Sequence, residues 1–234
     1  MGNAVLRGDL RARGASRKVL AIEFFYLGIL GLLTLLGLPP ELNRPEVSNQ
    51  TSLGLALLGV QGVLVTYFAS ACAAQEIAVE GERPSVDLAF GPFPRRMIVV
   101  GKSLASLATI VYWLLLGSPL LILAIGIRQG SVAMLAAVSA LVAIEAWGIA
   151  QLGLLYSIVI DSEFSRAVVH WTTLLALFVA TLALPVDQQW LNPIVAVARA
   201  AGGAFPVQAV IVYATLGLAA GGLAQLALRR YGAS

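Results

Sequence analysis

Long apolar runs alternate with short polar stretches along almost the whole chain. About 20 apolar residues in a helix cover about 30 Å, which is the thickness of the hydrocarbon core of a bilayer. The pattern therefore predicts an all-α, polytopic membrane protein in which residues 1–234 form a single transmembrane domain. The six predicted spans are residues 19–38, 53–74, 98–127, 132–160, 167–184 and 207–228.

Two further segments are apolar in part but lack the length or continuity of a span. Residues 1–18 place basic side chains beside a short apolar stripe, which predicts an amphipathic helix lying on the inner surface of the membrane. Residues 185–206 are broken by prolines and glycines, which predicts a partly re-entrant outer segment between spans five and six. Within span six, Gly217 and Gly221 lie four residues apart and predict close packing against another helix.

The composition agrees with this class. Hydrophobic residues make up 59% of the chain and charged residues 12%, with a mean hydropathy of +0.88. Soluble domains have roughly 45–50% apolar and about 25% charged residues. Cys72 is the only cysteine, which excludes a disulfide framework and a thiolate metal site within one chain. The net charge of +3 does not indicate nucleic-acid binding, because the basic residues lie at the ends of apolar runs.

The basic residues predict an orientation. With the N-terminus in the cytoplasm, twelve of the 15 Lys and Arg residues fall in cytoplasmic segments, and the outer segments keep only Arg44, Arg128 and Arg199. Cytoplasmic loops of membrane proteins carry such an excess of positive charge. We therefore expect a multi-pass protein of the inner (plasma) membrane with both termini in the cytoplasm.

Residues 75–102 form the longest polar interruption of the apolar pattern, and this orientation places them on the cytoplasmic side. They combine four acidic and four basic residues with several glycines and prolines. Such a segment is too charged to face lipid. It is either a solvated connection between spans two and three or a docking surface for a partner protein.

The order of residues in this segment resembles the ABC-2-type transporter permease family. An acidic stretch is followed by a turn with proline and basic residues, and then by hydrophobic residues and Gly-Lys at the start of the third span. The residues that carry the resemblance are Glu76, Glu80-Gly81-Glu82, Leu88, Pro94-Arg95-Arg96, Ile98-Val99-Val100 and Gly101-Lys102. Pro119 in span three and Asn192-Pro193 in the last outer segment are also similar. One departure is that Glu82-Arg83-Pro84 follows Gly81, where the family often has Gly-Thr.

The resemblance implies a permease subunit that dimerises, as a homodimer or with a related chain, and binds a separate cytoplasmic ABC ATPase. ATP and Mg would bind to that partner and no cofactor to this chain, which has no GxxxxGK[ST] phosphate loop and is expected not to be an enzyme. The segment between spans two and three would carry a coupling helix that contacts the ATPase. The residues expected to couple the two proteins are Glu76, Glu80, Gly81, Glu82, Arg83, Asp87, Arg95 and Arg96. The resemblance also implies export.

Four polar residues inside the predicted spans are candidates for a pathway or gate: Gln61, Glu145, His170 and Glu23. A carboxylate at the centre of a span costs about 2.5–3.5 kcal/mol unless it pairs or is protonated, so Glu145 is either a pathway residue or a neutral group that joins two helices. Glu23 and His170 lie near the cytoplasmic ends of spans one and five. They are expected to meet at the centre of the dimer, or else to reach the inner headgroups separately.

The resemblance implies a cavity lined mostly by spans two and five, and the apolar residues of these spans favour an amphipathic or hydrophobic substrate, whose identity the sequence leaves open. Other classes compete with this hypothesis. An importer-type ABC permease, a secondary transporter and a membrane scaffold all remain alternatives, whereas a protease or metal enzyme is disfavoured because His170 is the only histidine.

Overall fold

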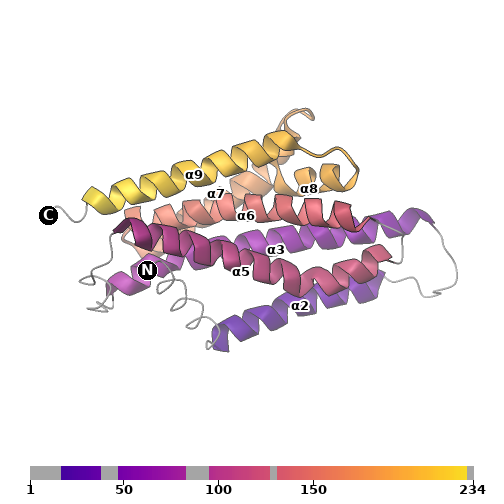
Figure 1. The fold of residues 1–234 in the computed structure, drawn as a ribbon, viewed down its shortest axis with the longest axis horizontal. Coiled ribbons are helices and arrows are strands. Elements are labelled where there is room, and N and C mark those ends of the chain that lie inside the picture. The colour runs from indigo at the N-terminus through magenta and orange to yellow at the C-terminus, as the bar shows by residue number, and fades with distance from the viewer. Residues whose placement is uncertain (1–16, 38–46, 83–94, 127–130, 231–234) are drawn as a thin grey trace.

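The computed structural model describes residues 17–37, 47–82, 95–126 and 131–230, and these residues form helices with no strand among them. The all-α prediction is therefore confirmed for the described part of the chain. The elements in order are α2 (Arg17–Gly37), α3 (Val47–Glu82), α5 (Arg95–Gly126), α6 (Val132–Val159), α7 (Glu163–Phe178), η1 (Ala180–Ala183), η2 (Gln189–Leu191), α8 (Pro193–Ala201) and α9 (Val207–Arg230) (Figure 1).

Five helical segments are long and apolar enough to cross a membrane, which confirms five of the predicted spans by length and composition. They are Ala56–Ala73, Met97–Leu123, Val132–Val159, Glu163–Ala183 and Val207–Leu228. The first predicted span is also helical, but its apolar part, Leu20–Leu36, is shorter than the other five. Its crossing of the membrane stays a prediction, and the amphipathic helix expected before it lies outside the described residues.

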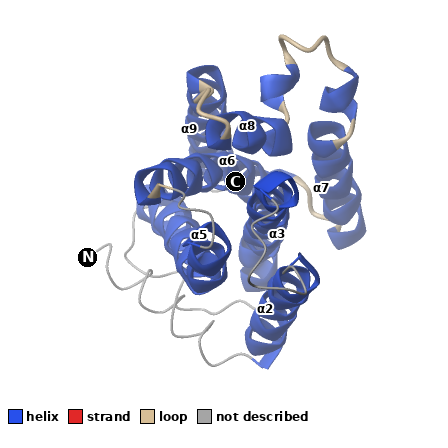
Figure 2. Cartoon of the chain, turned by 90° about the vertical axis from the view of Figure 1, so that its right-hand side faces the viewer, coloured by secondary structure: helices blue, strands red, loops and turns tan. Residues whose placement is uncertain are grey.

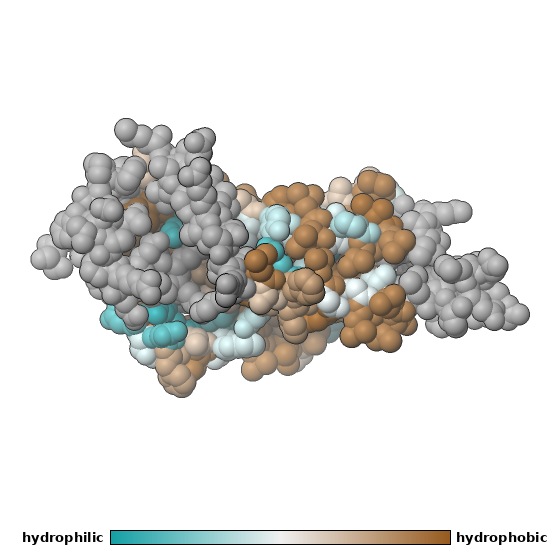
Figure 3. Space-filling view, turned by 90° about the horizontal axis from the view of Figure 1, so that it is seen from below, coloured by the Kyte–Doolittle hydropathy of each residue, from teal (hydrophilic) through white to brown (hydrophobic). Residues whose placement is uncertain are grey.

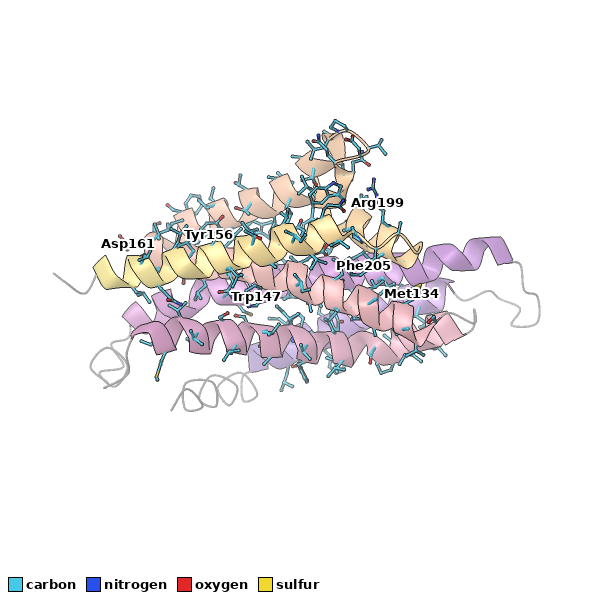
Figure 4. All side chains as sticks on the ribbon, turned by 45° about the horizontal axis from the view of Figure 1, so that its top comes forward. Met134, Trp147, Tyr156, Asp161, Arg199 and Phe205 are labelled. Atoms are coloured by element: carbon cyan, nitrogen blue, oxygen red, sulfur yellow. The ribbon has the colours of Figure 1, made fainter. Side chains whose placement is uncertain are left out.

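Successive long helices run in opposite directions, so their ends gather at two ends of the bundle (Figure 1). Asp161 lies at the end where α6 and α9 finish, and Arg199 and Phe205 lie toward the opposite end (Figure 4). We call these the Asp161 end and the Arg199 end. The last residues of α3 and the first residues of α5 are at the Asp161 end, which the positive charges predict to be cytoplasmic.

Helix α6 is the centre of the bundle and packs most extensively against α3 and α9 (Figure 2). Small residues allow these helices to approach closely. A Cβ atom on Gly148 of α6 would lie 2.5 Å from the backbone oxygen of Tyr213 in α9, and one on Gly217 would lie 2.6 Å from the ring of Trp147. Apolar side chains gain little by leaving lipid for one another, so close packing of this kind supplies much of the stability. The predicted packing role of Gly217 is confirmed.

Two helices continue beyond the spans that the sequence predicts. Helix α3 has 36 residues, about 54 Å, and continues through Glu82, past the predicted span 53–74. Helix α5 begins at Arg95, before the predicted span 98–127. Apolar length predicts where lipid ends, but hydrogen bonds along the backbone can continue a helix into water. The polar connection is thus reduced to residues 83–94, which lie outside the described residues together with the predicted coupling helix.

Pro119 lies inside α5, as expected, and the ribbon changes direction in the C-terminal half of this helix (Figure 1). Proline has no N–H to donate to the carbonyl four residues earlier, which here belongs to Leu115. Ser118 Oγ donates to that carbonyl at 2.8 Å. The side chain therefore supplies the hydrogen bond that the proline removes, as a helix in lipid requires.

The segment between α7 and α9 folds around Asn192, which is fully buried. Its amide nitrogen donates to the carbonyl of Phe178 and to the hydroxyl of Thr181, each at 2.9 Å. Its side-chain oxygen accepts from the N–H groups of Ile194 and Val195, which caps α8. The longest helix in this segment has nine residues, so the prediction that it is too short to span is confirmed. Its depth in the membrane stays a prediction.

The contact between α6 and α9 predicts a specific sensitivity to added volume. We expect Gly148→Ala to lower the free energy of unfolding by about 1–3 kcal/mol, because the new methyl group meets backbone that cannot rotate away. Gly222→Ala in α9 is the matched control, since nothing lies within 4 Å of the position that its methyl group would take. Thermal unfolding in nanodiscs would measure both, and equal midpoints for the two variants would contradict this account of the packing.

The two ends also predict a labelling pattern. Asp187 is exposed near the Arg199 end and Glu163 is exposed at the Asp161 end. We expect an impermeant maleimide to label Asp187→Cys in intact cells, and to label Glu163→Cys only after permeabilisation. Each variant would be made in a chain with Cys72→Ser. The reverse pattern would overturn the predicted orientation.

Candidate functional site

The residues predicted to couple to an ATPase lie on two helices that meet the same end of the bundle. Glu76, Glu80, Gly81 and Glu82 are in the last two turns of α3, and Arg95 and Arg96 open α5. Arg83 and Asp87 lie outside the described residues. The apolar part of α3 ends at Ala73, so the helix continues about 13 Å beyond it toward the Asp161 end.

Gln61 is buried on the side of α3 that faces α2 and α5. Its amide nitrogen donates to the carbonyl of Leu114 in α5 at 3.3 Å. Beside it, the hydroxyl of Tyr26 in α2 donates to the carbonyl of Trp113 at 2.9 Å. Both side chains fit against Gly117, where a Cβ atom would lie 2.4 Å from the Tyr26 oxygen. Gln61 therefore joins three helices, and its role in a pathway stays a prediction.

His170 is buried between α7 and α3, so it does not reach toward the headgroups from within this chain. Its Nε2 lies 3.3 Å from Ser70 Oγ, and that hydroxyl donates its own proton to the carbonyl of Thr66 at 2.7 Å. This assignment makes Nε2 the donor to Ser70. The ring of Tyr67 packs 5.0 Å from that of Trp171 beside this contact, centroid to centroid. Together these contacts attach α7 to α3.

Glu145 is near the midpoint of α6 and is 1% exposed. Its Oε1 atom has no hydrogen-bond partner among the described residues. Tyr213 in α9 is an ionisable neighbour, but its hydroxyl donates to the carbonyl of Leu191 instead. Oε1 therefore does not form the hydrogen bond to another helix that a polar link between two helices would require.

Glu23 of α2 lies beside the middle of α5. Tyr26, one turn later in α2, donates to the carbonyl of Trp113 in α5, and the carboxyl group of Glu23 is an electrostatic neighbour of Tyr112. Tyr112 is about halfway along the apolar stretch Met97–Leu123. Helix α2 begins farther from the Asp161 end than α5 does (Figure 1), and the contact of Tyr26 with Trp113 places residue 23 beside the middle of α5 although it is close to the start of its own helix.

The four predicted pathway residues do not converge within one chain. Gln61 bonds α5 and His170 contacts α3, whereas Glu145 is one turn from Gly148, which packs against α9, and Glu23 is partly exposed. The expected contact between Glu23 and His170 is absent within the described part of this chain, where each has a different partner. Among the described residues, no group of three His, Cys, Asp or Glu side chains could hold a metal ion.

The sequence reasoning missed the partners of these residues. Tyr112, Ser70 and Tyr26 are single polar groups in apolar runs, and each becomes informative only beside a partner from another helix. A search for hydroxyl groups near the middle of a span would have found Tyr112.

Comparison with known proteins adds no identification. No protein-family model matches the sequence, and no match is found among curated proteins.

The contrast between Glu145 and Gln61 predicts opposite effects of the same substitution. We expect Gln61→Met to lower the free energy of unfolding by about 1 kcal/mol, because it removes the hydrogen bond that the Leu114 carbonyl accepts from the Gln61 amide. Glu145→Met should leave stability unchanged or raise it, because it removes a buried oxygen without a partner. Thermal unfolding of both variants in nanodiscs is the measurement. A larger loss for Glu145→Met would indicate that its carboxyl group stabilises the fold.

Proposed function

We propose that this chain is the membrane-spanning permease subunit of an ABC-2-type transporter. It would form a dimer and would be driven by a separate cytoplasmic ATPase that binds ATP and Mg. The pathway would lie at the dimer interface and would carry an amphipathic or hydrophobic substrate. Export is expected from the resemblance of residues 76–102 to the family.

The observation that carries the proposal is the continuity and position of α3. One unbroken helix runs from Val47 to Glu82, and its acidic last turns extend beyond its apolar part. The same helix contacts α2, α5, α6, α7 and α8. A continuous helix transmits a displacement along its axis, so a partner that binds the last turns of α3 could move a helix that touches most of the bundle. This is the mechanical role expected of a coupling segment.

The packing of the outer helices supports a dimer. In the apolar stretch that begins with α7, Glu163–Ala183, 17% of residues are buried inside the chain, compared with 50% in the apolar part of α3. Among the side chains of α2 that the structure describes, the buried ones form one narrow stripe, made by Tyr26, Leu30 and Thr34. These two helices therefore keep wide apolar faces that a second permease subunit could cover, whereas α3 and α6 have little apolar surface left.

A second candidate function, a secondary transporter, is favoured by one observation. Glu145 is an ionisable group in the middle of a span, and such groups often belong to ion or proton pathways. The two candidates differ in their energy source. Transport that continues without ATP but stops when the proton gradient is dissipated would favour the secondary transporter.

Charge reversal on α3 tests the coupling role. We expect Glu80→Lys combined with Glu82→Lys to give a normally inserted dimer that loses co-purification of the ATPase or the stimulation of its hydrolysis. The reason is that reversed charges repel a complementary partner surface, while packing between spans does not depend on them. Insertion, dimerisation, co-purification and ATP hydrolysis would be measured on the same preparations.

Asp187→Lys is the matched control, because it reverses an exposed acidic residue near the opposite end of the bundle. It should affect neither binding nor stimulation. Inserting two glycines between Ala74 and Gln75 adds a second test, because it interrupts α3 while keeping its charges. We expect this variant to bind the ATPase but to lose stimulation. Retention of binding and stimulation by the charge-reversal variant would overturn the coupling role.

A further inference from the structure

The face formed by α2 and α5 carries a polar pair where an apolar surface is expected. Glu23 is partly exposed and Tyr112 is 47% exposed. Leu20 is one turn from Glu23 and Leu115 is one turn from Tyr112, and both leucines are exposed. We call these four residues the Glu23 surface. Figure 3 views this side of the bundle and shows hydrophilic atoms near mid-length, bordered by apolar surface.

Glu23 and Tyr112 lie near the middle of the apolar layer. The apolar stretch Met97–Leu123 continues for more than ten residues on either side of Tyr112, which is about 15 Å or more of helix in each direction. Glu23 is one turn before Tyr26, which bonds Trp113 of α5, so its carboxyl group lies within the layer that the apolar helices define. A carboxylate facing lipid tails at this depth is costly, and acidic residues inside membranes usually face a partner or a pathway.

The partner within the chain satisfies only part of this requirement. The phenol of Tyr112 can donate a hydrogen bond to a nearby carboxylate but carries no positive charge. Its exposed ring also presents an aromatic face, and aromatic faces attract cations. The surface thus combines one negative charge, one aromatic ring and flanking apolar side chains, which is the complement of a cationic group attached to a hydrophobic body.

We propose that the Glu23 surface binds the positively charged group of a cationic amphiphile that reaches it from within the bilayer. The carboxylate of Glu23 pairs with the cation, the ring of Tyr112 packs against it, and Leu20 and Leu115 contact its apolar part. The binding site does not depend on the proposed function. The further conclusion that such amphiphiles are the transported substrates does rest on it.

This surface is on a different side of the bundle from the least buried span. Helix α5 lies on one flank of α2, and α7 lies toward the other (Figure 2). A second subunit packed against α7 and the side of α2 that faces away from α5 would therefore leave the Glu23 surface open to the bilayer.

Binding can be tested without an ATPase. The purified chain in phosphatidylcholine nanodiscs would be titrated with tetraphenylphosphonium, and with tetraphenylborate, which has nearly the same shape but the opposite charge. Equilibrium dialysis against empty nanodiscs corrects for partition into lipid. We expect saturable binding of the cation only, and an affinity about tenfold weaker in Glu23→Gln, because loss of about 1.4 kcal/mol corresponds to that factor.

Two further variants separate the contributions. Tyr112→Phe keeps the aromatic ring and should weaken binding less than Glu23→Gln does. Glu163→Gln removes an exposed acidic residue at the start of α7 and should bind as the unmodified chain does. Equal binding of the borate, or full affinity in Glu23→Gln, would overturn the proposal.

Carbodiimide labelling provides a test that needs no variant. Dicyclohexylcarbodiimide reaches carboxyl groups from the lipid phase, so mass spectrometry should find Glu23 modified and the buried Glu145 unmodified. Tetraphenylphosphonium should protect Glu23, and tetraphenylborate should not. An unreactive Glu23, together with disulfide formation between two copies of Tyr112→Cys, would assign this face to a second subunit and overturn the proposal. Neither outcome affects the test of ATPase coupling, which changes residues of α3 and not of the Glu23 surface.

Discussion

The close contact of α6 with α3 and α9 is the constraint on which the rest of the bundle depends. In lipid there is little hydrophobic gain when apolar helices associate, so they are held by backbone proximity and shape. Gly148 and Gly217 bring α6 and α9 into contact, and Gly62 admits the side chain of Val142 between α6 and α3. Because α6 is in contact with both α3 and α9, displacement of one of these helices changes the surface against which the others pack.

Polar and aromatic side chains add specific contacts between the outer helices and this centre. Tyr26 and Gln61 bond backbone carbonyls of α5, His170 meets Ser70, and Tyr156 lies 3.0 Å from the hydroxyl of Thr173. Each of these contacts is local, so the peripheral helices retain broad apolar faces. A bundle with a tightly packed centre and loosely covered flanks can associate with further chains or ligands without loss of its own packing.

The proposed function and the proposed cation site draw on different parts of the molecule. The first depends on the acidic end of α3, which extends beyond the apolar layer, and the second on Glu23 and Tyr112 within that layer. If both proposals hold, the distance between them requires the helices to connect an event at the Asp161 end with one near the middle of the bundle. Helix α3 contacts both α2 and α5 and is therefore the element that could make this connection.

The sequence by itself determined the helical class, the approximate positions of five spans and the short broken segment before α9. These features follow from the length of apolar runs and from proline and glycine, which act locally. The sequence also predicted close packing at Gly217. It did not determine how far α3 continues, because backbone hydrogen bonds extend a helix past the point where its side chains become polar.

Only the tertiary structure decided the depth and partner of each polar residue. Glu23 is a few residues from the start of α2, and position along the chain therefore placed it near the surface. The offset between α2 and α5 places it beside Tyr112 instead. In the same way, Glu145 and Gln61 are both single polar residues in apolar spans, yet one has an oxygen without a partner and the other bonds a neighbouring helix. The physical reason is that the cost of a polar group in lipid depends on the atoms that surround it, and those atoms come from helices distant in the sequence.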